Sequence, residues 1–474
     1  MMQHMNGISG IEKDRIIEGN KLEYGEKHDA LRWPTAQEAE NASSERNELL
    51  EHLFALDVKS CCNGAKLDCR KLSPGCRICI EGSWSCLFIN GTCNGRCFYC
   101  PSEQTETDDP MTNTVPFPNV EDYIDYIAKF GFTGVSISGG EPFLTFDKSL
   151  AFAAKIKRKF AGGIYLWIYT NGTLVTEEKL KQLRDAGLDE IRFDIGAVDY
   201  RLENVKLAAR IIDKVTVEIP AIPDEFHLLK EAIPRMKEIG VDFLNLHQLR
   251  LTPYNYPRVA KRNYTFLHGP KVTVLESELT ALKAIKFAVE QDVDLPINYC
   301  SFVYKERFQK MAARKRHAAL IRKPYEDITA AGYIRTLIIK GSPDHIEQHV
   351  EIFKKNGEDE RLWSRESSRL SFSQSLWKYI DFNKFSLTVV YHETRVCPFI
   401  SYHHEFREIR LNDNKAVFIE RRPVFTGKEL DREDAWFFGK IMTTGKTPAP
   451  ASMDAYWNEI LDFERLKPGL AAYF

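Results

Sequence analysis

The sequence lacks any run of about eighteen apolar residues, the length that a membrane-spanning helix needs. Its first residues, Met1 to Glu18, are polar and lack the apolar stretch flanked by small residues that marks a signal peptide. No membrane partner and no export are therefore indicated, and we expect a cytoplasmic protein.

The sequence also lacks an excess of charge of either sign. Its 65 Lys and Arg residues oppose 67 Asp and Glu residues, which gives a formal net charge of -2. Such a balance produces no general attraction to nucleic acid or to an anionic membrane, so any contact of that kind must come from a local patch. Low-complexity tracts are missing too, as are internal repeats beyond a strand-helix unit.

Cysteine, by contrast, is abundant. Nine of the eleven cysteines lie between residues 61 and 100. Disulfides belong mainly to secreted chains, so a cysteine cluster in a chain without an export signal favours metal binding. An anaerobic cell is the natural setting for such a protein.

Three of these cysteines, Cys93, Cys97 and Cys100, have the spacing Cys-x3-Cys-x2-Cys and offer three thiolates from one loop. Iron–sulfur clusters are held by Cys thiolates, so three ligands on a four-iron cube leave one iron open to a small molecule. A zinc site or a disulfide knot is the alternative, but zinc sites usually show paired Cys or His ligands that close four positions. A second motif, Gly139-Gly140-Glu141-Pro142, follows the apolar run 135–138.

The two motifs together resemble the signature of the radical S-adenosylmethionine (SAM) enzymes, and the resemblance extends over residues 84–300. It implies a [4Fe-4S] cluster whose open iron binds SAM, and a reductant such as flavodoxin or ferredoxin. One electron from the cluster then cleaves SAM to methionine and a 5′-deoxyadenosyl radical, which removes hydrogen from an unactivated C–H bond of the substrate, an oxidoreductase chemistry. An iron–sulfur electron carrier or scaffold is less favoured, because a carrier needs neither an open iron nor the Gly-Gly-Glu-Pro motif.

Strands alternate with amphipathic helices from about Leu87 onward, which indicates a parallel sheet built from strand-helix units. The predicted strands are 86–90, 134–138, 164–170, 190–194, 214–219 and 243–249. The predicted helices are 120–130, 146–159, 177–186, 202–212, 227–239 and 277–291. These units resemble the partial (βα)6 TIM-type barrel of the radical SAM family, in which active groups gather at the carboxyl ends of the strands.

The fold class is accordingly α/β, and a chain of 474 residues suffices for about two or three domains. The predicted segments are an N-terminal extension with a helix near 44–56 (1–60), a Cys-rich auxiliary cluster segment (61–86), the radical SAM partial barrel (87–300), a basic helical bridge (301–332) and a small C-terminal α+β domain (333–474).

Several SAM contacts are implied by the resemblance. Tyr99 precedes the third cysteine, where family members contact the adenine, although a packed aromatic beside the cluster is the plain alternative. Gly139 and Gly140 correspond to the edge that binds the SAM ammonium, where missing side chains let a ligand approach the backbone. Glu141 then turns the chain with Pro142.

Further candidates end the later strands. Thr170 and Asn171 could bind the ribose or the methionyl carboxylate, and Asp194 matches a ribose-binding position or else serves as a buried helix cap. Glu218 ends the fifth predicted strand, near the family's adenine-side contacts. His247 could contact substrate, but a lone histidine on a strand is more often a satisfied interior group.

The upstream cysteines Cys69, Cys76, Cys79 and Cys86 could hold a second site. We favour an auxiliary [4Fe-4S] cluster over structural zinc, because a redox partner suits a radical enzyme while the spacing fits either metal. Cys300 is a further candidate ligand, with a buried inert thiol as its common alternative. Cys86 as a ligand would favour an electron relay, whereas Cys300 as a ligand would let the second cluster bind substrate.

A basic helix is predicted from Tyr304 to Lys323. It is either a solvated face or a patch, over 305–323, for RNA, phosphate or an acidic peptide. Together with the segment 298–301 it is weakly similar to an uncharacterised branch related to pyruvate formate-lyase activating enzymes. Those activases are usually shorter and place their extra cysteines after the triplet, so activase function is not carried over. A peptide or protein is the leading substrate class, and RNA or a phosphorylated small molecule is the alternative.

Overall fold

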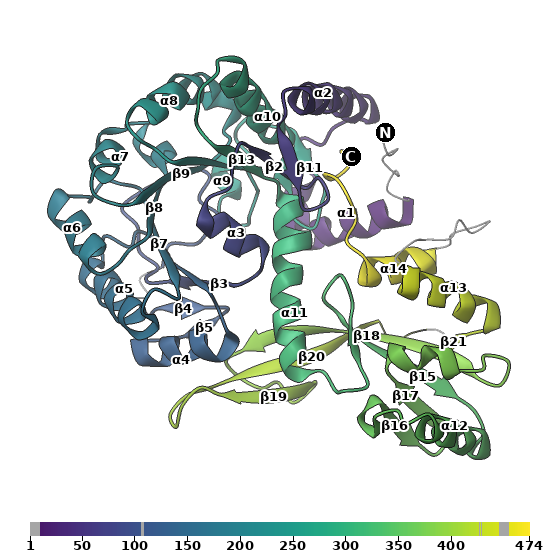
Figure 1. The fold of residues 1–474 in the computed structure, drawn as a ribbon. Helices are drawn as coiled ribbons and strands as arrows, with labels where there is room; N and C mark the ends of the chain where they lie inside the picture. The colour runs from purple at the N-terminus through teal and green to yellow at the C-terminus, as the bar shows by residue number, and fades with distance from the viewer. Residues whose placement is uncertain (1–9, 106–108, 426, 428, 445–454) are drawn as a thin grey trace. The chain divides into compact units, whose positions relative to one another are not determined.

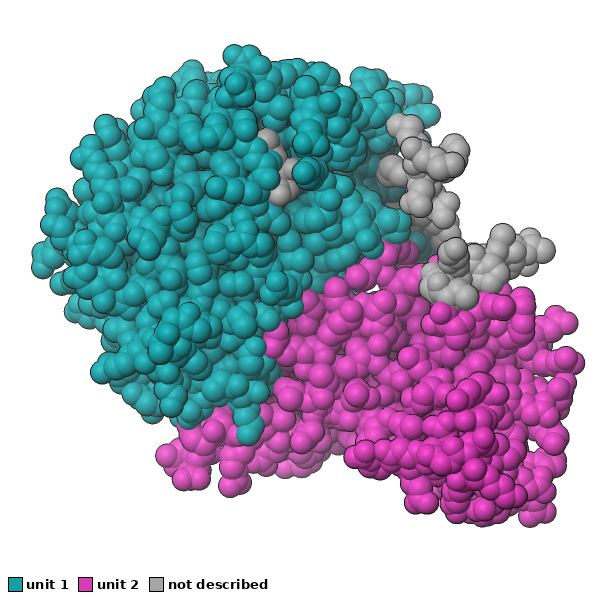
Figure 2. Space-filling view, in the orientation of Figure 1, with its two compact units in different colours: residues 1–112, 116–309, 468–474 teal, residues 113–115, 310–467 magenta. Residues whose placement is uncertain are grey.

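The structure of the protein, a computed structural model, describes residues 10–105, 109–425, 427, 429–444 and 455–474. The chain divides into two compact units, which Figure 2 colours teal and magenta. The first consists of Met1–Thr112, Pro116–Gln309 and Pro468–Phe474, and the second of Asn113–Val115 and Lys310–Lys467. Among the described residues, no helix has the length and apolar content needed to cross a bilayer.

Parallel strands form the core of the first unit, and the helices that connect them lie outside the sheet (Figure 1). In chain order these strands are β3 (Trp84–Phe88), β6 (Gly134–Ser138), β7 (Tyr165–Thr170), β8 (Glu190–Phe193), β9 (Lys214–Pro220), β10 (Phe243–His247) and β13 (Ile297–Cys300). Short edge strands are β1 (Lys59–Cys61), β2 (Lys66–Cys69), β4 (Met111–Thr112) and β5 (Val115–Pro116). The sheet order is β1-β2-β13-β10-β9-β8-β7-β6-β3-β4-β5. The expected α/β fold is thus confirmed, with β13 as a further parallel strand after the six predicted ones.

The outer helices are α4 (Val120–Phe130), α5 (Phe146–Phe160), α6 (Glu177–Asp185), α7 (Glu203–Ala208), α8 (Phe226–Glu238) and α10 (Leu275–Glu290). Helix α4 shows how the sequence sets their limits. Asn119 caps its start by accepting a hydrogen bond from the Glu121 amide at 3.1 Å, and Gly131 ends it with a φ of 63°. Its apolar residues, including Tyr123 and Ile127, are buried against the sheet.

One short helix, α3 (Pro74–Ile80), lies within the curve of the strands (Figure 1). Two glycines make room for it. A Cβ on Gly75 would lie 2.2 Å from Nη2 of Arg192 on β8, and a Cβ on Gly134 would lie 2.7 Å from a methyl group of Ile78. Helix α3 therefore fills part of the barrel interior and carries Cys76 and Cys79 there.

The N-terminal residues are more helical than the sequence analysis expected. They form α1 (Gly10–Tyr24) and α2 (Ala36–Ala55), so α2 begins eight residues before the predicted Ser44. The reason is a capping box: the Thr35 hydroxyl accepts a hydrogen bond from the Glu38 amide, and the Glu38 carboxylate accepts one from the Thr35 amide. Shorter elements of this unit are α9 (Tyr256–Val259), β11 (Phe266–Leu267) and β12 (Thr273–Val274).

The second unit is an antiparallel sheet with helices, which confirms the expected α+β character of the C-terminal region. Its sheet path is β16-β17-β15-β18-β20-β19, with β14 paired to β15 and β21 to β18. The strands are β14 (Asp327–Ile328), β15 (Ile334–Lys340), β16 (Trp363–Glu366), β17 (Arg369–Phe372), β18 (Ser386–Cys397), β19 (Glu405–Arg410), β20 (Ala416–Phe425) and β21 (Glu429–Leu430). The helices are α11 (Lys310–Ile321), α12 (Pro343–Lys355), α13 (Arg432–Thr444) and α14 (Ala455–Glu464). Leu337, Phe353, Phe372 and Val389 lie in its hydrophobic core.

Candidate functional site

The loop that carries the cysteine triplet rests on the Gly139-Gly140 pair at the carboxyl end of β6. A Cβ on Gly139 would lie 2.4 Å from the Asn90 carbonyl oxygen, and a Cβ on Gly140 would lie 1.8 Å from the Thr92 carbonyl oxygen. The Gly140 amide donates to Asn90 O at 3.1 Å, and the Glu141 amide donates to Thr92 O at 2.8 Å. Only residues without side chains allow this close approach of two backbones, so the glycines fix the start of the triplet loop.

The three thiols of the loop are free, and three thiols are the donor chemistry that an iron–sulfur cluster takes. The sulfurs of Cys93 and Cys97 lie 3.4 and 3.7 Å from the position that a Cβ would take on Gly95, so no side chain fills the space between them. Burial raises the pKa of Cys93, and it raises the pKa of Cys97 to about 12. Because the thiolate is the form that binds metal, these cysteines need a cation to lose their protons.

Tyr99 and Asp194, two predicted SAM contacts, are hydrogen-bonded to each other. The Tyr99 hydroxyl donates to Oδ1 of Asp194 at 2.8 Å, and a Cβ on Gly196 would lie 2.6 Å from that hydroxyl. Burial raises the pKa of Asp194 to about 6 despite the hydrogen bond from Tyr99. The pair thus connects the triplet loop to the end of β8, and the Asp194 carboxyl group takes up a proton at a higher pH than an exposed carboxyl group does.

The Glu141 carboxylate joins the ends of β6 and β7. It accepts hydrogen bonds from the Thr170 hydroxyl at 2.8 Å, from the Asn171 amide at 2.7 Å and from the Phe143 amide at 3.0 Å. The Asn171 side-chain amide in turn donates to Oδ1 of Asn94 at 2.8 Å and lies 3.9 Å from the Cys93 sulfur. Three of the predicted contacts, Glu141, Thr170 and Asn171, therefore form one network under the triplet loop.

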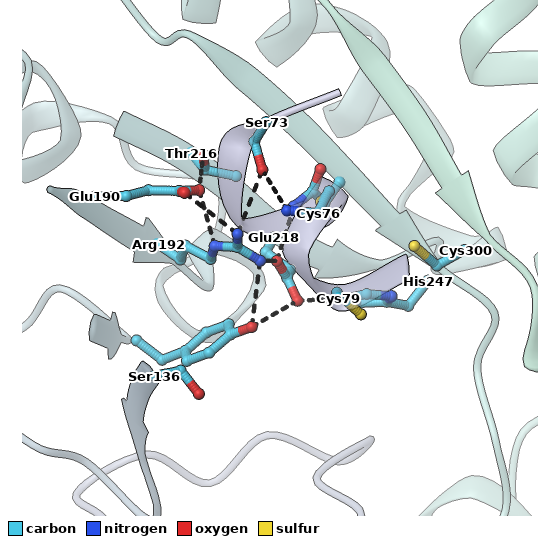
Figure 3. Close-up of polar contacts among 12 residues, drawn as sticks. Ser73, Cys76, Cys79, Ser136, Glu190, Arg192, Thr216, Glu218, His247 and Cys300 are labelled. Atoms are coloured by element: carbon cyan, nitrogen blue, oxygen red, sulfur yellow. Dashed lines mark hydrogen bonds and ion pairs between the residues drawn. The ribbon is translucent and has the colours of Figure 1, made fainter. Parts of the chain in front are cut away.

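Glu218 belongs to a buried ion-pair network (Figure 3). Its carboxylate accepts hydrogen bonds from Arg192 at 2.7 Å, from Asn245 at 2.8 Å and from Nε2 of His247 at 2.7 Å. Burial would raise the pKa of Glu218, but the cations Arg192 and His247 prevail and hold it well below its usual range. Arg192 also pairs with Glu190 at 2.8 Å.

Arg192 and Glu190 were not predicted as site residues. The available signal was the pattern of polar residues at alternate positions of buried strands: 190 and 192 on β8, 216 and 218 on β9, and 245 and 247 on β10. Alternate residues of a strand face the same side of the sheet, so this pattern indicates a polar barrel interior.

A second group of thiols surrounds Lys66, which the sequence analysis also missed. Nζ of Lys66 lies 2.6 Å from the Cys300 sulfur, and the Lys66 side chain is 1% exposed. Cys79 lies 3.3 Å from the Tyr304 hydroxyl, and the Cys76 sulfur lies 4.0 Å from the Asn298 amide nitrogen. Burial would raise the pKa of Cys300, but Lys66 and His247 lower it to about 6.

The other two predicted auxiliary ligands are placed differently. Cys86 lies within β3, opposite Ser136 of β6, so the strand begins two residues earlier than the predicted range 86–90. Burial raises the pKa of the Cys86 thiol to about 11, although a hydrogen bond with Ser136 opposes this. Cys69 ends β2, and its side chain lies outside the described residues.

The predicted basic helix is divided between the two units. Tyr304–Gln309 forms a π-helix in the first unit, and Lys310–Ile321 forms α11 in the second. Within the second unit, Arg314 donates to the Ala331 carbonyl at 2.8 Å and Arg322 donates to the Glu326 carbonyl at 2.9 Å. Lys323 forms an ion pair with Glu405 at 3.1 Å. These cations serve structural contacts, so fewer remain for phosphate or RNA.

Comparisons with known proteins agree with this site. The family profile described as the radical SAM superfamily matches residues 87–226, which include the triplet and the Gly-Gly-Glu-Pro motif. A protein of Methanocaldococcus jannaschii, named provisionally as a glycyl-radical enzyme activating enzyme, is 34% identical over 302 residues, covering 60% of this chain and 78% of the relative.

Other matches are shorter or more distant. A GTP 3′,8-cyclase of Aliarcobacter butzleri is 31% identical over 130 residues, covering 27% of this chain and 38% of the cyclase. The crystal structure of SuiB from Streptococcus suis, bound to the precursor peptide SuiA, has a TM-score of 0.35 at 13% identity and covers 58% of this chain and 55% of that chain.

Proposed function

Because the chain belongs to the radical SAM superfamily, we propose that Cys93, Cys97 and Cys100 hold a [4Fe-4S] cluster that binds SAM. When bound, this cluster supplies the electron that cleaves SAM, and the resulting 5′-deoxyadenosyl radical removes a hydrogen atom from the substrate. The observation that carries the proposal is the contact between the two motifs. Gly139 and Gly140 press against the backbone of residues 90–92, and the free thiols follow directly on the same loop.

The chain's own residues then bind and orient the ligand. Tyr99 and Asp194 would face the adenosine, and the Gly139-Gly140 backbone would face the amino group. Glu141 acts through its neighbours, because its carboxylate already accepts three hydrogen bonds that hold Thr170 and Asn171 in place. Glu218 is likewise paired within the barrel. These assignments extend the family resemblance residue by residue.

A second iron–sulfur cluster and an external reductant such as flavodoxin or ferredoxin complete the proposed cofactor chemistry. Support for the second cluster comes from the additional thiols that α3 and β13 carry into the first unit. Support for the reductant is chemical: cleavage of SAM consumes one electron per event, and the cluster must receive it from outside.

We propose a peptide or protein as the substrate. The relative from Methanocaldococcus jannaschii, of which this chain covers 78%, is named for the activation of an enzyme, which is a protein target. The alternative of an RNA substrate is weakened by the structural contacts of Arg314, Arg322 and Lys323 within the second unit.

Reductive SAM cleavage tests the proposed reaction. Anaerobically reconstituted protein is mixed with dithionite and SAM, and 5′-deoxyadenosine is measured by chromatography. We expect product from the wild type and from Cys397→Ala, a matched cysteine control in the second unit, and none above background from Cys97→Ala. Equal product from Cys97→Ala and the wild type would contradict the proposal.

The substrate class has its own test. Extract of the source cells is divided into a macromolecular fraction and a small-molecule filtrate, and each is added to the cleavage reaction. The proposal expects the macromolecular fraction to stimulate SAM cleavage, and protease treatment to abolish the effect. Stimulation by the filtrate, or stimulation that is sensitive to ribonuclease, would contradict a peptide or protein substrate.

A further inference from the structure

Two segments that are far apart in the sequence meet at one edge of the barrel sheet. Strand β2 pairs antiparallel with β13, and this register places Lys66 directly opposite Cys300. Strand β1 pairs with β2 so that Cys61 lies opposite Lys66, and the turn that follows β1 begins with Cys62. The Cys62 thiol forms a hydrogen bond with Cys61 and lies close enough to Lys66 and Cys300 for electrostatic interaction with both. The hairpin thus brings two cysteines and a lysine to the carboxyl end of β13.

Helix α3 brings two more thiols to the same place from inside the barrel. Cys76 and Cys79 are three residues apart, so they share one face of the helix. The Cys76 sulfur lies 4.0 Å from Nδ2 of Asn298, while Oδ1 of the same amide lies 3.3 Å from the Cys300 sulfur. The Cys79 sulfur lies 3.3 Å from the Tyr304 hydroxyl and 3.2 Å from Nε2 of Gln309.

The buried ammonium group of Lys66 indicates that this site needs negative charge. Its ammonium group is buried, it contacts Cys300, and its Nζ lies 4.9 Å from the centre of the Tyr304 ring. No carboxylate among the side chains that the structure describes forms an ion pair with it. A buried ammonium is costly unless negative charge compensates it, and the available negative groups are thiolates.

We propose that Cys62, Cys76, Cys79 and Cys300 hold the second iron–sulfur cluster and that Lys66 balances its negative charge. This assignment deepens the proposed function and rests on it for its role in the reaction. The four thiols come from three elements that only the folded first unit brings together: the β1-β2 hairpin, α3 and β13. Cys86, which contacts Ser136 on the far strands β3 and β6, is not part of this set.

Among the residues that the structure describes, no three Cys, His, Asp or Glu side chains are placed to hold a single metal ion. The side-chain amide of Asn298 lies between the sulfurs of Cys76 and Cys300. One zinc ion would require both sulfurs at about 2.3 Å from a common centre, whereas in a cube each thiolate binds a different iron. The thiolates of a cube therefore stand further apart than those around one ion, and the separated sulfurs of Cys76 and Cys300 fit a cube.

The position of the site within the barrel separates two roles for the second cluster. Cys300 ends β13, and its neighbour on β10 in the register is His247, which Glu218 holds at 2.7 Å (Figure 3). Carboxyl ends of barrel strands are where substrates bind. The cluster thus faces the polar barrel interior, and contact with substrate fits this position better than docking of an external electron donor.

Metal analysis of variants tests the assignment. Iron, sulfide and zinc per chain are measured after anaerobic reconstitution of Cys93→Ala/Cys97→Ala/Cys100→Ala, in which the first site is removed. We expect about four irons in this background. Because three thiolates can still hold a four-iron cube, two ligands are removed at a time. We expect those irons to be lost on adding Cys76→Ser/Cys79→Ser or Cys62→Ser/Cys300→Ser, and to be retained with Cys86→Ser or with Cys61→Ser/Cys300→Ser. Circular dichroism identifies any variant that fails to fold.

The outcomes separate the two proposals. Absence of iron from the triple variant, retention of zinc in its place, or equal loss with Cys86→Ser would overturn the second site. Loss of iron with Cys61→Ser/Cys300→Ser but not with Cys62→Ser/Cys300→Ser would overturn Cys62 as the fourth ligand. If the triple variant and the wild type both bind four irons at this site and neither cleaves SAM, the proposed function fails while the second site stands.

The reduction potential of the second cluster tests the role of Lys66, because a merely structural role would not change it. In the triple variant, Lys66→Met removes the positive charge, and we expect the reduction potential of the remaining cluster to shift to a more negative value. Lys66→Arg keeps the charge and should keep a potential close to that of the parent. Equal potentials for the methionine and arginine variants would contradict the role of Lys66 as the counter-charge.

Discussion

At the scale of single residues, the glycines of the barrel are as informative as the cysteines. Gly140 has no space for a side chain, because the Thr92 carbonyl lies where its Cβ would be. The two glycines of the Gly-Gly-Glu-Pro motif therefore position the backbone of the triplet loop. Glu141 stabilises this arrangement through its hydrogen bonds with Thr170 and Asn171.

Gly140→Ala is expected to displace the triplet loop. Its Cβ would lie 1.8 Å from a backbone oxygen, and overpacking of this kind typically costs about 1–3 kcal/mol of stability. We expect a lower unfolding temperature and the loss of iron from the first site, measured by thermal unfolding and by iron analysis. Gly19→Ala is the control, because nothing lies within 4 Å of its Cβ. Full iron content in Gly140→Ala would show that the loop does not depend on this contact.

His268 is expected to make the stability of the protein depend on pH. Burial lowers the pKa of His268 to about 4, whereas an unfolded histidine titrates near 6.5. The unfolded chain therefore binds the additional proton first, and stability falls as the pH drops from about 6.5 to about 4, by no more than about 3 kcal/mol.

His268→Phe removes this titration while keeping an aromatic ring next to Trp33, on which His268 stacks at 3.7 Å between ring centroids. Urea unfolding between pH 7 and pH 4 should show a shallower loss of stability in the variant than in the wild type. The same slope in both proteins would contradict the expectation, whatever the difference in absolute stability.

At the scale of elements, α3 is the one whose position the sequence did not reveal. It has only 7 residues, and its start depends on Ser73, whose hydroxyl accepts a hydrogen bond from the Cys76 amide at 3.1 Å. The same hydroxyl also accepts one from Arg192 at 3.3 Å, which connects the helix to the ion-pair network.

Ser73→Ala should therefore affect more than helix stability. Loss of an N-cap costs about 1 kcal/mol, and we expect the variant also to lose part of the iron of the second site in the triple-alanine background. Thr176→Ala on the outer helix α6 is the matched control: it removes a cap at a similar cost and should leave the iron unchanged. Equal iron contents in the two variants would show that iron binding at the second site does not depend on the cap of α3.

Other elements were predictable to different degrees. The six predicted strands are present because each is a short segment with apolar residues at consecutive or alternate positions, and turns bound them. Strand β13 lies within the predicted barrel segment 87–300 but was not predicted as a strand, since Pro296 lies directly before it and polar residues interrupt its apolar run. The role of Lys66 depends on the pairing of β2 with β13, which joins residues 234 positions apart in the sequence. No local pattern contains that information.

At the scale of the whole molecule, the chain has two units with separate cores. In the second unit, a buried carboxylate anchors the sheet: Glu326 is 2% exposed and accepts hydrogen bonds from Arg421 at 2.7 and 3.0 Å. Thr336 on β15 donates to the same carboxylate at 3.0 Å.

Glu326→Gln is expected to destabilise the second unit in the full chain. Removing one partner of a buried ion pair costs about 3–5 kcal/mol, because the other charge is left uncompensated. Hydrogen exchange should rise in residues 310–467, while the iron content of the first unit stays at the wild-type value. The control is Glu347→Gln, whose exposed pair with Arg365 should contribute less than about 1 kcal/mol. Similar exchange in both variants would contradict the importance of the buried pair.

The superfamily was predictable from the sequence, whereas the residues that support the site were not. Cysteine spacing and a glycine pair are local signals, and they indicated the superfamily from the sequence alone. The SAM contacts at Tyr99, Asp194 and Glu218 stay predictions, because hydrogen bonds within the protein already occupy these side chains. Arg192, Lys66 and Tyr304 depend on contacts between distant segments, so only the folded chain reveals them.

The most direct test of the central claim is the electron paramagnetic resonance spectrum of the reduced, reconstituted Cys76→Ser/Cys79→Ser variant, recorded before and after SAM is added. This variant isolates the cluster of Cys93, Cys97 and Cys100, whose fourth iron has no protein ligand. The account expects a four-iron signal that changes when SAM binds and that is absent from a variant also carrying Cys97→Ala. A signal that SAM leaves unchanged, or one that persists without Cys97, would contradict it.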